Sequence, residues 1–206
     1  MGNAVGCKNT SCTCRHHPEE LSRRAVLKTA LALGVALPWL RPAPAAALDV
    51  TIVRPQRLDR LVYAFGEKAG QVISTESMEI GVSLVIAYPM DPVSSVIRSG
   101  SRFNQILLLR LDPADLTEET RQYAADGVVA YSAVCTHLGC PLSGWFPQEK
   151  VIKCWCHGSV FDPKDYGRVL DGPAPKRLAI LPLAVNDGAL IAAGEFLGKV
   201  GFFSQA

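Results

Sequence analysis

Two short segments rich in cysteine and histidine constrain the fold of this chain more than any other feature. Residues 135–140 (loop 1) read Cys-Thr-His-Leu-Gly-Cys, and residues 154–159 (loop 2) read Cys-Trp-Cys-His-Gly-Ser. The chain has four histidines, and one falls in each loop. Cysteine and histidine together in this way are typical of metal ligation. We therefore expect a fold that brings the two loops to one metal centre.

Each loop offers one cysteine–histidine pair and one additional cysteine. The pairs are Cys135 with His137 and Cys154 with His157. Tetrahedral zinc accepts two thiolates and two imidazoles, and so does a [2Fe–2S] cluster with two cysteines on one iron and two histidines on the other. Zinc would leave the additional cysteines without a role. A third alternative is two ordinary disulfides with uninvolved histidines.

Other cysteine chemistries fit the pattern less well. Attachment of c-type haem requires C-x-x-C-H, and loop 2 is one residue short of that spacing. Four cysteines clustered between residues 135 and 156 favour ligation over a single cysteine nucleophile. The net charge of +2 gives no argument for binding nucleic acid.

Residues 48–206 have the pattern of an all-β domain. Hydrophobic residues make up 49% of the chain, enough for a sizeable core. Short apolar runs bounded by Gly, Pro, Asp or Ser predict strands at 61–65, 81–88, 105–111 and 128–132. Asn186-Asp187-Gly188 between two further runs predicts a hairpin. Residues 115–124, with an acidic first turn, predict a short helix. We expect an antiparallel β base with a cluster-binding subdomain inserted at about 133–175.

Residues 1–47 have the pattern of an export signal. Arg23 and Arg24 precede the apolar run 29–40, and three alanines follow at 45–47. The paired arginines indicate a twin-arginine signal, with the apolar run as its helix. That run is shorter than the roughly 20 residues of a membrane-spanning helix. We therefore expect cleavage near Ala47, and a location in the periplasm or at the periplasmic face of the inner membrane. This signal region would also contain Cys7, Cys12, Cys14, His16 and His17.

The paired loops resemble those of the high-potential Rieske iron–sulfur proteins. This family includes the iron–sulfur subunit of cytochrome bc complexes and the small subunit of arsenite oxidase. Residues 172–175, Gly-Pro-Ala-Pro, resemble the family's proline loop, which shields the cluster. The resemblance implies a [2Fe–2S] cluster with two ligands on each iron: Cys135 and Cys154 on the buried iron, His137 and His157 on the outer iron.

The resemblance also implies a disulfide between Cys140 and Cys156. Such a bond would close a segment of about 16 residues, for which the chain-entropy model gives roughly 3 kcal/mol. An exported protein reaches an oxidising compartment, where a disulfide persists. The pairing would therefore hold loop 1 and loop 2 together.

Several neighbouring residues are expected to surround the cluster. Ser159 matches a family serine that donates a hydrogen bond to a bridging sulfide, whereas Phe161 departs from the tyrosine of many bc-type members. Because phenylalanine lacks the hydroxyl, we expect a potential high within the Rieske range of about −150 to +300 mV, yet below that of tyrosine-bearing relatives. Leu138, Gly172 and Pro173 are expected beside the cluster, and Trp155 is expected to shield it.

The residues and the resemblance suggest three electron-transfer roles. The favoured role is an electron-transfer subunit of an exported oxidoreductase, similar to the arsenite oxidase small subunit, that passes single electrons between a donor site on a molybdenum subunit and a cytochrome-type acceptor. The alternative is the quinol-oxidising iron–sulfur subunit of a cytochrome bc complex, with cytochromes b and c as partners and a membrane-spanning N-terminus. The third is a free ferredoxin-like carrier, which the two additional cysteines and the export signal disfavour. None of these is a stand-alone enzyme.

Overall fold

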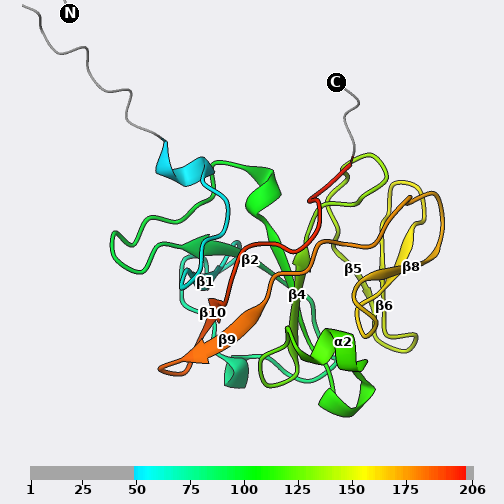
Figure 1. Ribbon diagram of the computed structural model, residues 1–206, viewed down its shortest axis with the longest axis horizontal. Coiled ribbons are helices and arrows are strands. Elements are labelled where there is room, and N and C mark those ends of the chain that lie inside the picture. The colour runs from blue at the N-terminus through cyan, green and yellow to red at the C-terminus, as the bar shows by residue number, and fades with distance from the viewer. Residues whose placement is uncertain (1–48, 203–206) are drawn as a thin grey trace, which may run out of the picture. The chain divides into compact units, whose positions relative to one another are not determined.

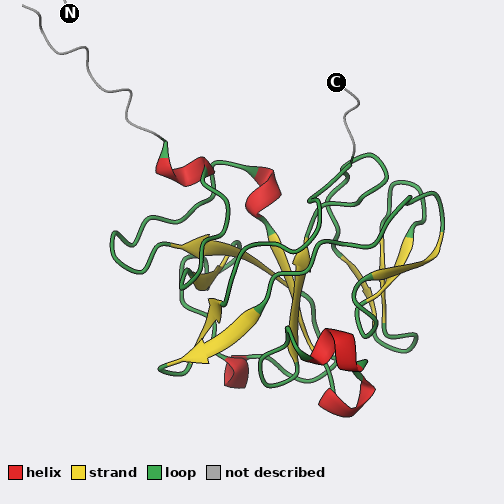
Figure 2. Ribbon diagram, viewed as in Figure 1, coloured by secondary structure: helices red, strands yellow, loops and turns green. Residues whose placement is uncertain are grey.

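The computed structural model describes residues 49–202 (Figures 1 and 2). The expected export signal and its cysteines and histidines lie outside this range. Within it, the chain forms ten strands and only short helices (Figure 2). The all-β fold class expected from the sequence is therefore confirmed. None of the helices between residues 49 and 202 is long and apolar enough to cross a membrane.

The larger sheet is antiparallel and has six strands in the order β4-β3-β2-β1-β10-β9 (Figure 1). We call it the base sheet. Its strands are β1 (Arg60–Tyr63), β2 (Val85–Met90), β3 (Ile106–Arg110), β4 (Val128–Ser132), β9 (Leu183–Asn186) and β10 (Ala189–Ala192). All four predicted strands are present. The run 81–88 begins as a strand only at Val85, because Gly81 lies in a turn with a φ of 71°.

The hairpin between β9 and β10 is also confirmed. Asn186 pairs with Ala189, so Asp187 and Gly188 form a two-residue turn. Both have positive φ, 50° and 76°. This is the backbone that the Asp-Gly pair adopts readily and that matches the twist of the flanking strands.

The smaller sheet is also antiparallel, with four strands in the order β5-β6-β7-β8. We call it the site sheet; β6 and β8 are labelled at the right of Figure 1. Its strands are β5 (Gly144–Phe146), β6 (Val151–Lys153), β7 (Val160–Asp162) and β8 (Arg168–Asp171). Three of them have three residues, which is too short for an alternating apolar pattern to stand out in the sequence.

Strands β3 and β4 of the base sheet are buried on both faces. Along β3, Leu107 and Leu109 belong to one apolar cluster, whereas Ile106 and Leu108 belong to a second. This division follows from the two-residue period of a strand, which sends successive side chains to opposite faces. The first cluster also contains Ile152 and Phe161 of the site sheet. One face of the base sheet therefore packs against the site sheet.

The predicted helix at 115–124 is present but shorter. A 3₁₀ turn, η4 (Pro113–Asp115), comes first, and the α-helix α2 covers only Glu118–Arg121. Thr117 caps it by accepting a hydrogen bond from the N–H of Thr120. After α2 the chain continues in i→i−3 bonds, from Tyr123 to Thr120 and from Ala124 to Arg121. The other 3₁₀ turns are η1 (Val50–Ile52), η2 (Thr75–Ser77) and η3 (Arg102–Asn104).

Candidate metal centre

The two loops occupy equivalent places between strands. Loop 1 lies between β4 and β5, and loop 2 lies between β6 and β7. In loop 1 the N–H of Cys135 donates to the carbonyl of Cys140 at 2.8 Å, and the N–H of Gly139 donates to the carbonyl of Cys135 at 3.0 Å. Loop 2 repeats both bonds. These turns hold each leading cysteine at the inner end of its loop.

In loop 2 the N–H of Cys154 donates to the carbonyl of Ser159 at 2.8 Å, and that of Gly158 donates to the carbonyl of Cys154 at 3.0 Å. The glycine is the fifth residue of both loops, with φ of 78° at Gly139 and 75° at Gly158. Side chains other than glycine rarely adopt this backbone. The two loops are therefore two copies of one turn with the ligand cysteine at the first position of each, whereas the histidine and the second cysteine stand at different positions.

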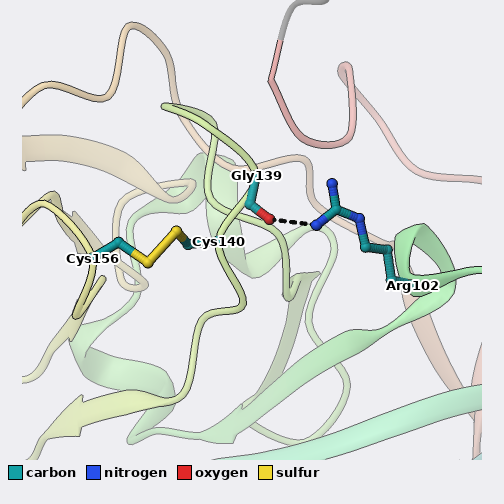
Figure 3. The surroundings of a disulfide bond; sticks show 4 residues. All are labelled: Arg102, Gly139, Cys140 and Cys156. Atoms are coloured by element: carbon teal, nitrogen blue, oxygen red, sulfur yellow. Dashed lines mark hydrogen bonds between the residues drawn. A yellow bond between two sulfur atoms is a disulfide. The ribbon is translucent and has the colours of Figure 1, made fainter.

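The disulfide implied by the family resemblance is present. Cys140 of loop 1 is bonded to Cys156 of loop 2, with their Cα atoms 6.5 Å apart (Figure 3). The sulfurs of Cys140, Cys154 and Cys156 all lie within 4.8 Å of one another. Because two of them form the disulfide, only the thiol of Cys154 in this group is free to bind a metal.

The four expected ligands differ in how deeply they are buried. The thiols of Cys135 and Cys154 are free and buried, each residue being 1% exposed. His137 is half-buried and His157 is exposed. Their rings are perpendicular, with centroids 4.7 Å apart. The two thiols therefore lie on the inner side of the site and the two imidazoles on the outer side.

The electrostatics of the inner side suit a bound cation. Burial raises the pKa of the Cys135 thiol, and the neighbouring Cys154 raises it further, whereas hydrogen bonds from the His137 N–H and the Ser159 hydroxyl lower it. The raised pKa means that the Cys135 thiol resists ionisation on its own. Metal ions reverse this balance, because a coordinated thiol loses its proton.

One buried atom of the site lacks a hydrogen-bond partner. Within residues 49–202, Nδ1 of His137 is one of two buried side-chain nitrogen or oxygen atoms without one. Such atoms are uncommon, and an absent ion is one of their ordinary explanations. Two soft thiols on the inner side and two imidazoles on the outer side, one with an unpartnered nitrogen, fit the ligand set of a Rieske [2Fe–2S] cluster.

Ser159 connects loop 2 to the proline loop, residues 172–175. Its hydroxyl oxygen accepts the N–H of Ala174 at 3.1 Å, and its hydroxyl hydrogen can be donated toward the sulfur of Cys135. Gly172 lies so close to loop 2 that a Cβ atom there would be 2.5 Å from the Cα of Ser159. The proline loop therefore packs directly on loop 2, with Pro173 exposed.

Loop 1 is tied to the end of the same segment. The hydroxyl of Thr136 donates to the carbonyl of Lys176, one residue beyond the proline loop, at 2.6 Å. The sequence offered no signal for this contact, because it joins residues 40 positions apart. Through this bond and the bond from Ala174 to Ser159, residues 172–176 contact both loop 1 and loop 2.

The aromatic residues near the site divide into one buried and one exposed. Phe161 on β7 is fully buried, in the apolar cluster that contains Cys135 and Cys154. Trp155 is 66% exposed and packs on Phe146 at 5.5 Å between ring centroids. Trp155 therefore lies on the surface of loop 2, and its expected role as a shield of the cluster stays a prediction. Leu138 is also exposed, at 59%.

Comparison with known proteins agrees with this geometry. Residues 106–182, which include both loops and the proline loop, match the family model for the Rieske [2Fe–2S] domain. The Rieske iron–sulfur subunit of the cytochrome bc1 complex of Streptomyces lividans is 41% identical over 98 residues, which are 47% of this chain and 58% of that protein. The corresponding subunit of Corynebacterium glutamicum is 40% identical over 104 residues, 48% of this chain and 26% of that protein.

A solved structure titled "Hyperthermophilic respiratory Complex III" matches with a TM-score of 0.40 and 24% identity, over 82% of this chain and 93% of that chain. The chain spans little more than half of the Streptomyces lividans subunit and about a quarter of the Corynebacterium glutamicum subunit.

Proposed function

Because the chain carries a Rieske [2Fe–2S] domain, we propose that it is the iron–sulfur subunit of a cytochrome bc-type complex. In this role it takes single electrons from a quinol and passes them to a cytochrome. The observation that carries the proposal is the 41% identity to a cytochrome bc1 iron–sulfur subunit. That similarity favours the bc-type role over the arsenite-oxidase-like role, which the sequence patterns alone had put first.

The arrangement of the histidines suits a proton-coupled role. A bound [2Fe–2S] cluster supplies one-electron chemistry. His137 would bind through Nδ1, the buried nitrogen without a partner, and this leaves its Nε2 free. His157 is exposed and perpendicular to it. An imidazole bound to an oxidised iron can lose the proton of its other nitrogen; in that form the nitrogen would accept a hydrogen bond from a quinol hydroxyl and take up its proton as the electron leaves the quinol.

The surroundings of the ligands exclude water from the inner side of the site. Cys135, Cys154 and Ser159 are each at most 1% exposed, and the proline loop packs over loop 2. By contrast, Leu138 and Trp155 are largely exposed beside the histidines. Electrons would therefore enter and leave at the histidine end, where a partner can dock on exposed apolar side chains.

The disulfide and the paired arginines at positions 23 and 24 support an exported protein. We propose that the domain acts at the periplasmic face of the inner membrane, beside cytochromes b and c.

Affinity purification of the full chain from solubilised native cells tests the proposal. Cytochromes b and c should co-purify, and the preparation should reduce cytochrome c with quinol. His157→Ala should abolish the reduction, because it removes an exposed ligand, whereas Glu67→Ala, an exposed change in a base-sheet turn, should leave it unchanged. Co-purification of a molybdenum subunit without cytochrome b would contradict the bc-type role and restore the arsenite-oxidase-like one.

A further inference from the structure

Arg102 reaches loop 1 because of the pairing of β3 and β4. These strands are antiparallel, with Ile106 opposite Ser132. The pairing continues beyond the strands, since the N–H of Ala133 donates to the carbonyl of Gln105 at 3.0 Å. The chain that enters β3 therefore runs beside the chain that leaves β4. As a result, η3 lies next to loop 1.

The guanidinium of Arg102 binds the backbone of loop 1. Its Nη1 donates to the carbonyl oxygen of Gly139 at 3.0 Å (Figure 3). Gly139 is enclosed on this side: a Cβ atom there would lie 2.5 Å from a ring carbon of Phe202 and 3.1 Å from Nη2 of Arg102. Together with a φ of 78°, this crowding makes glycine necessary. Arg102 thus contacts the one residue of loop 1 between Leu138 and the disulfide.

Arg102 is itself held between aromatic rings. Its guanidinium carbon lies 5.0 Å from the ring centroid of Phe103 and 6.0 Å from that of Phe202. Among the ion pairs of residues 49–202, none involves Arg102. Its positive charge is therefore fixed against loop 1 and is not neutralised by a carboxylate in contact.

The hydrogen bond from Arg102 involves the peptide group between Gly139 and Cys140. The carbonyl of Gly139 and the N–H of Cys140 belong to one trans peptide, so they point in opposite directions. Because the carbonyl points to Arg102, the N–H points away from it. Figure 3 shows Arg102 and the disulfide on opposite sides of the Gly139 carbonyl. A charged donor on the carbonyl polarises the peptide and strengthens the N–H as a donor.

We propose that Arg102 is a positioning residue that fixes loop 1 and raises the reduction potential of the cluster. Reduction adds one negative charge to the cluster, and a fixed positive charge nearby stabilises that charge. A more strongly polarised N–H in loop 1 would act in the same direction, because hydrogen bonds toward cluster sulfurs raise the potential. This inference rests on the presence of the Rieske cluster but not on the identity of the partner complex.

A pair of arginine variants of the full chain, loaded with its cluster, tests the inference by redox titration at one pH. In Arg102→Gln the charge is lost, and we expect the equilibrium constant for one-electron reduction to fall about three- to tenfold; tenfold corresponds to 59 mV. Arg54→Gln is the matched control. Arg54 donates to the carbonyl of Phe103 at 2.8 Å and lies over the same ring at 5.2 Å, and these two contacts are with Phe103 rather than with loop 1.

Arg102→Lys keeps the charge and should retain most of the wild-type potential. Amide hydrogen exchange supplies a second measurement that needs no cluster: the Gly139 N–H should exchange faster in Arg102→Gln than in Arg54→Gln. Equal potentials and equal exchange in the two glutamine variants would overturn the inference. Absence of iron and sulfide from the wild-type chain would instead overturn the Rieske assignment on which the proposed function rests.

Discussion

The base sheet and the site sheet are stabilised in different ways. In β3 and β4 of the base sheet, large apolar side chains are fully buried on both faces. The site sheet contributes only Ile152 and Phe161 to the largest fully buried side chains. Its loops are held together instead by a disulfide, by turns that contain glycine, and by hydrogen bonds from side chains to backbone groups. The base is therefore stable through apolar burial, whereas the site depends on cross-links and on its cluster.

The two sheets nevertheless share one apolar cluster and a few specific bonds. The hydroxyl of Tyr131 on β4 donates to the carbonyl of Pro163, beyond β7, at 2.8 Å in a buried setting. The indole N–H of Trp145 on β5 donates to the carbonyl of Gly81 at 3.0 Å. These bonds fix the site sheet on the base.

The largest effect is expected from a cavity in the base. Leu108→Ala removes a fully buried side chain from the face of β3 that points away from the site. We expect a loss of about 2–5 kcal/mol in the free energy of unfolding, measured by denaturant titration. The midpoint potential under native conditions should not change. A shifted potential would show that the base and the site are not separate in the way we describe.

Removal of the disulfide should have a slightly smaller effect, confined to the site. The double variant Cys140→Ala/Cys156→Ala removes a disulfide that joins residues 16 positions apart. The chain-entropy model gives such a cross-link a stabilisation of roughly 3 kcal/mol. We expect iron to be released at lower temperature, and amides of β5–β8 to exchange faster. Amides of β3 and β4 should keep their protection. Equal loss of protection in both sheets would contradict the comparison.

Tyr131→Phe tests the connection between the sheets. It removes the hydroxyl that bonds the Pro163 carbonyl and leaves that buried carbonyl unpaired. We expect the free energy of unfolding to fall by about 1–3 kcal/mol, measured as a thermal transition of the site sheet at lower temperature. Tyr123→Phe, a partly buried tyrosine in the same apolar cluster, is the control. If Tyr131→Phe has no more effect than the control, apolar packing alone joins the sheets.

The smallest effect is expected at Phe161. Phe161→Tyr adds a hydroxyl inside the cluster of side chains that contains Cys135 and Cys154. A hydrogen bond from this hydroxyl to a ligand sulfur would stabilise the reduced state by about 1 kcal/mol and raise the midpoint potential. Phe146→Tyr, the same change on a half-buried residue of β5, should leave the potential unchanged. An unchanged or lower potential in Phe161→Tyr would count against this explanation.

The two regions also differ in how far the sequence predicts them. β3 and β4 follow from apolar runs, and the hairpin follows from Asn186-Asp187-Gly188, because these signals are local. The strands of the site sheet were not predicted individually, since three residues carry no readable period. The predicted helix was too long because Pro113 starts a separate 3₁₀ turn and the end of α2 changes to i→i−3 bonds.

In the site itself, the local motifs predicted the residues that come together, and the resemblance predicted the disulfide. The contacts that surround them were not predicted. Arg102 bonds Gly139 across 37 positions, and Thr136 bonds Lys176 across 40. Both contacts follow from strand pairing, which brings distant segments together without a motif. The exposure of Trp155 was also not predictable, because an aromatic residue between two cysteines fits a buried or a surface position equally well.

The most direct test of the account is a metal and sulfide analysis of the purified full chain, combined with spectroscopy of the nitrogen ligands. We predict two irons and two acid-labile sulfides per chain, with two imidazole nitrogens coupled to the reduced cluster, and loss of one of these couplings in His157→Ala. One zinc ion per chain without sulfide would contradict it, and would mean that Cys135, His137, Cys154 and His157 form a structural site rather than an electron carrier.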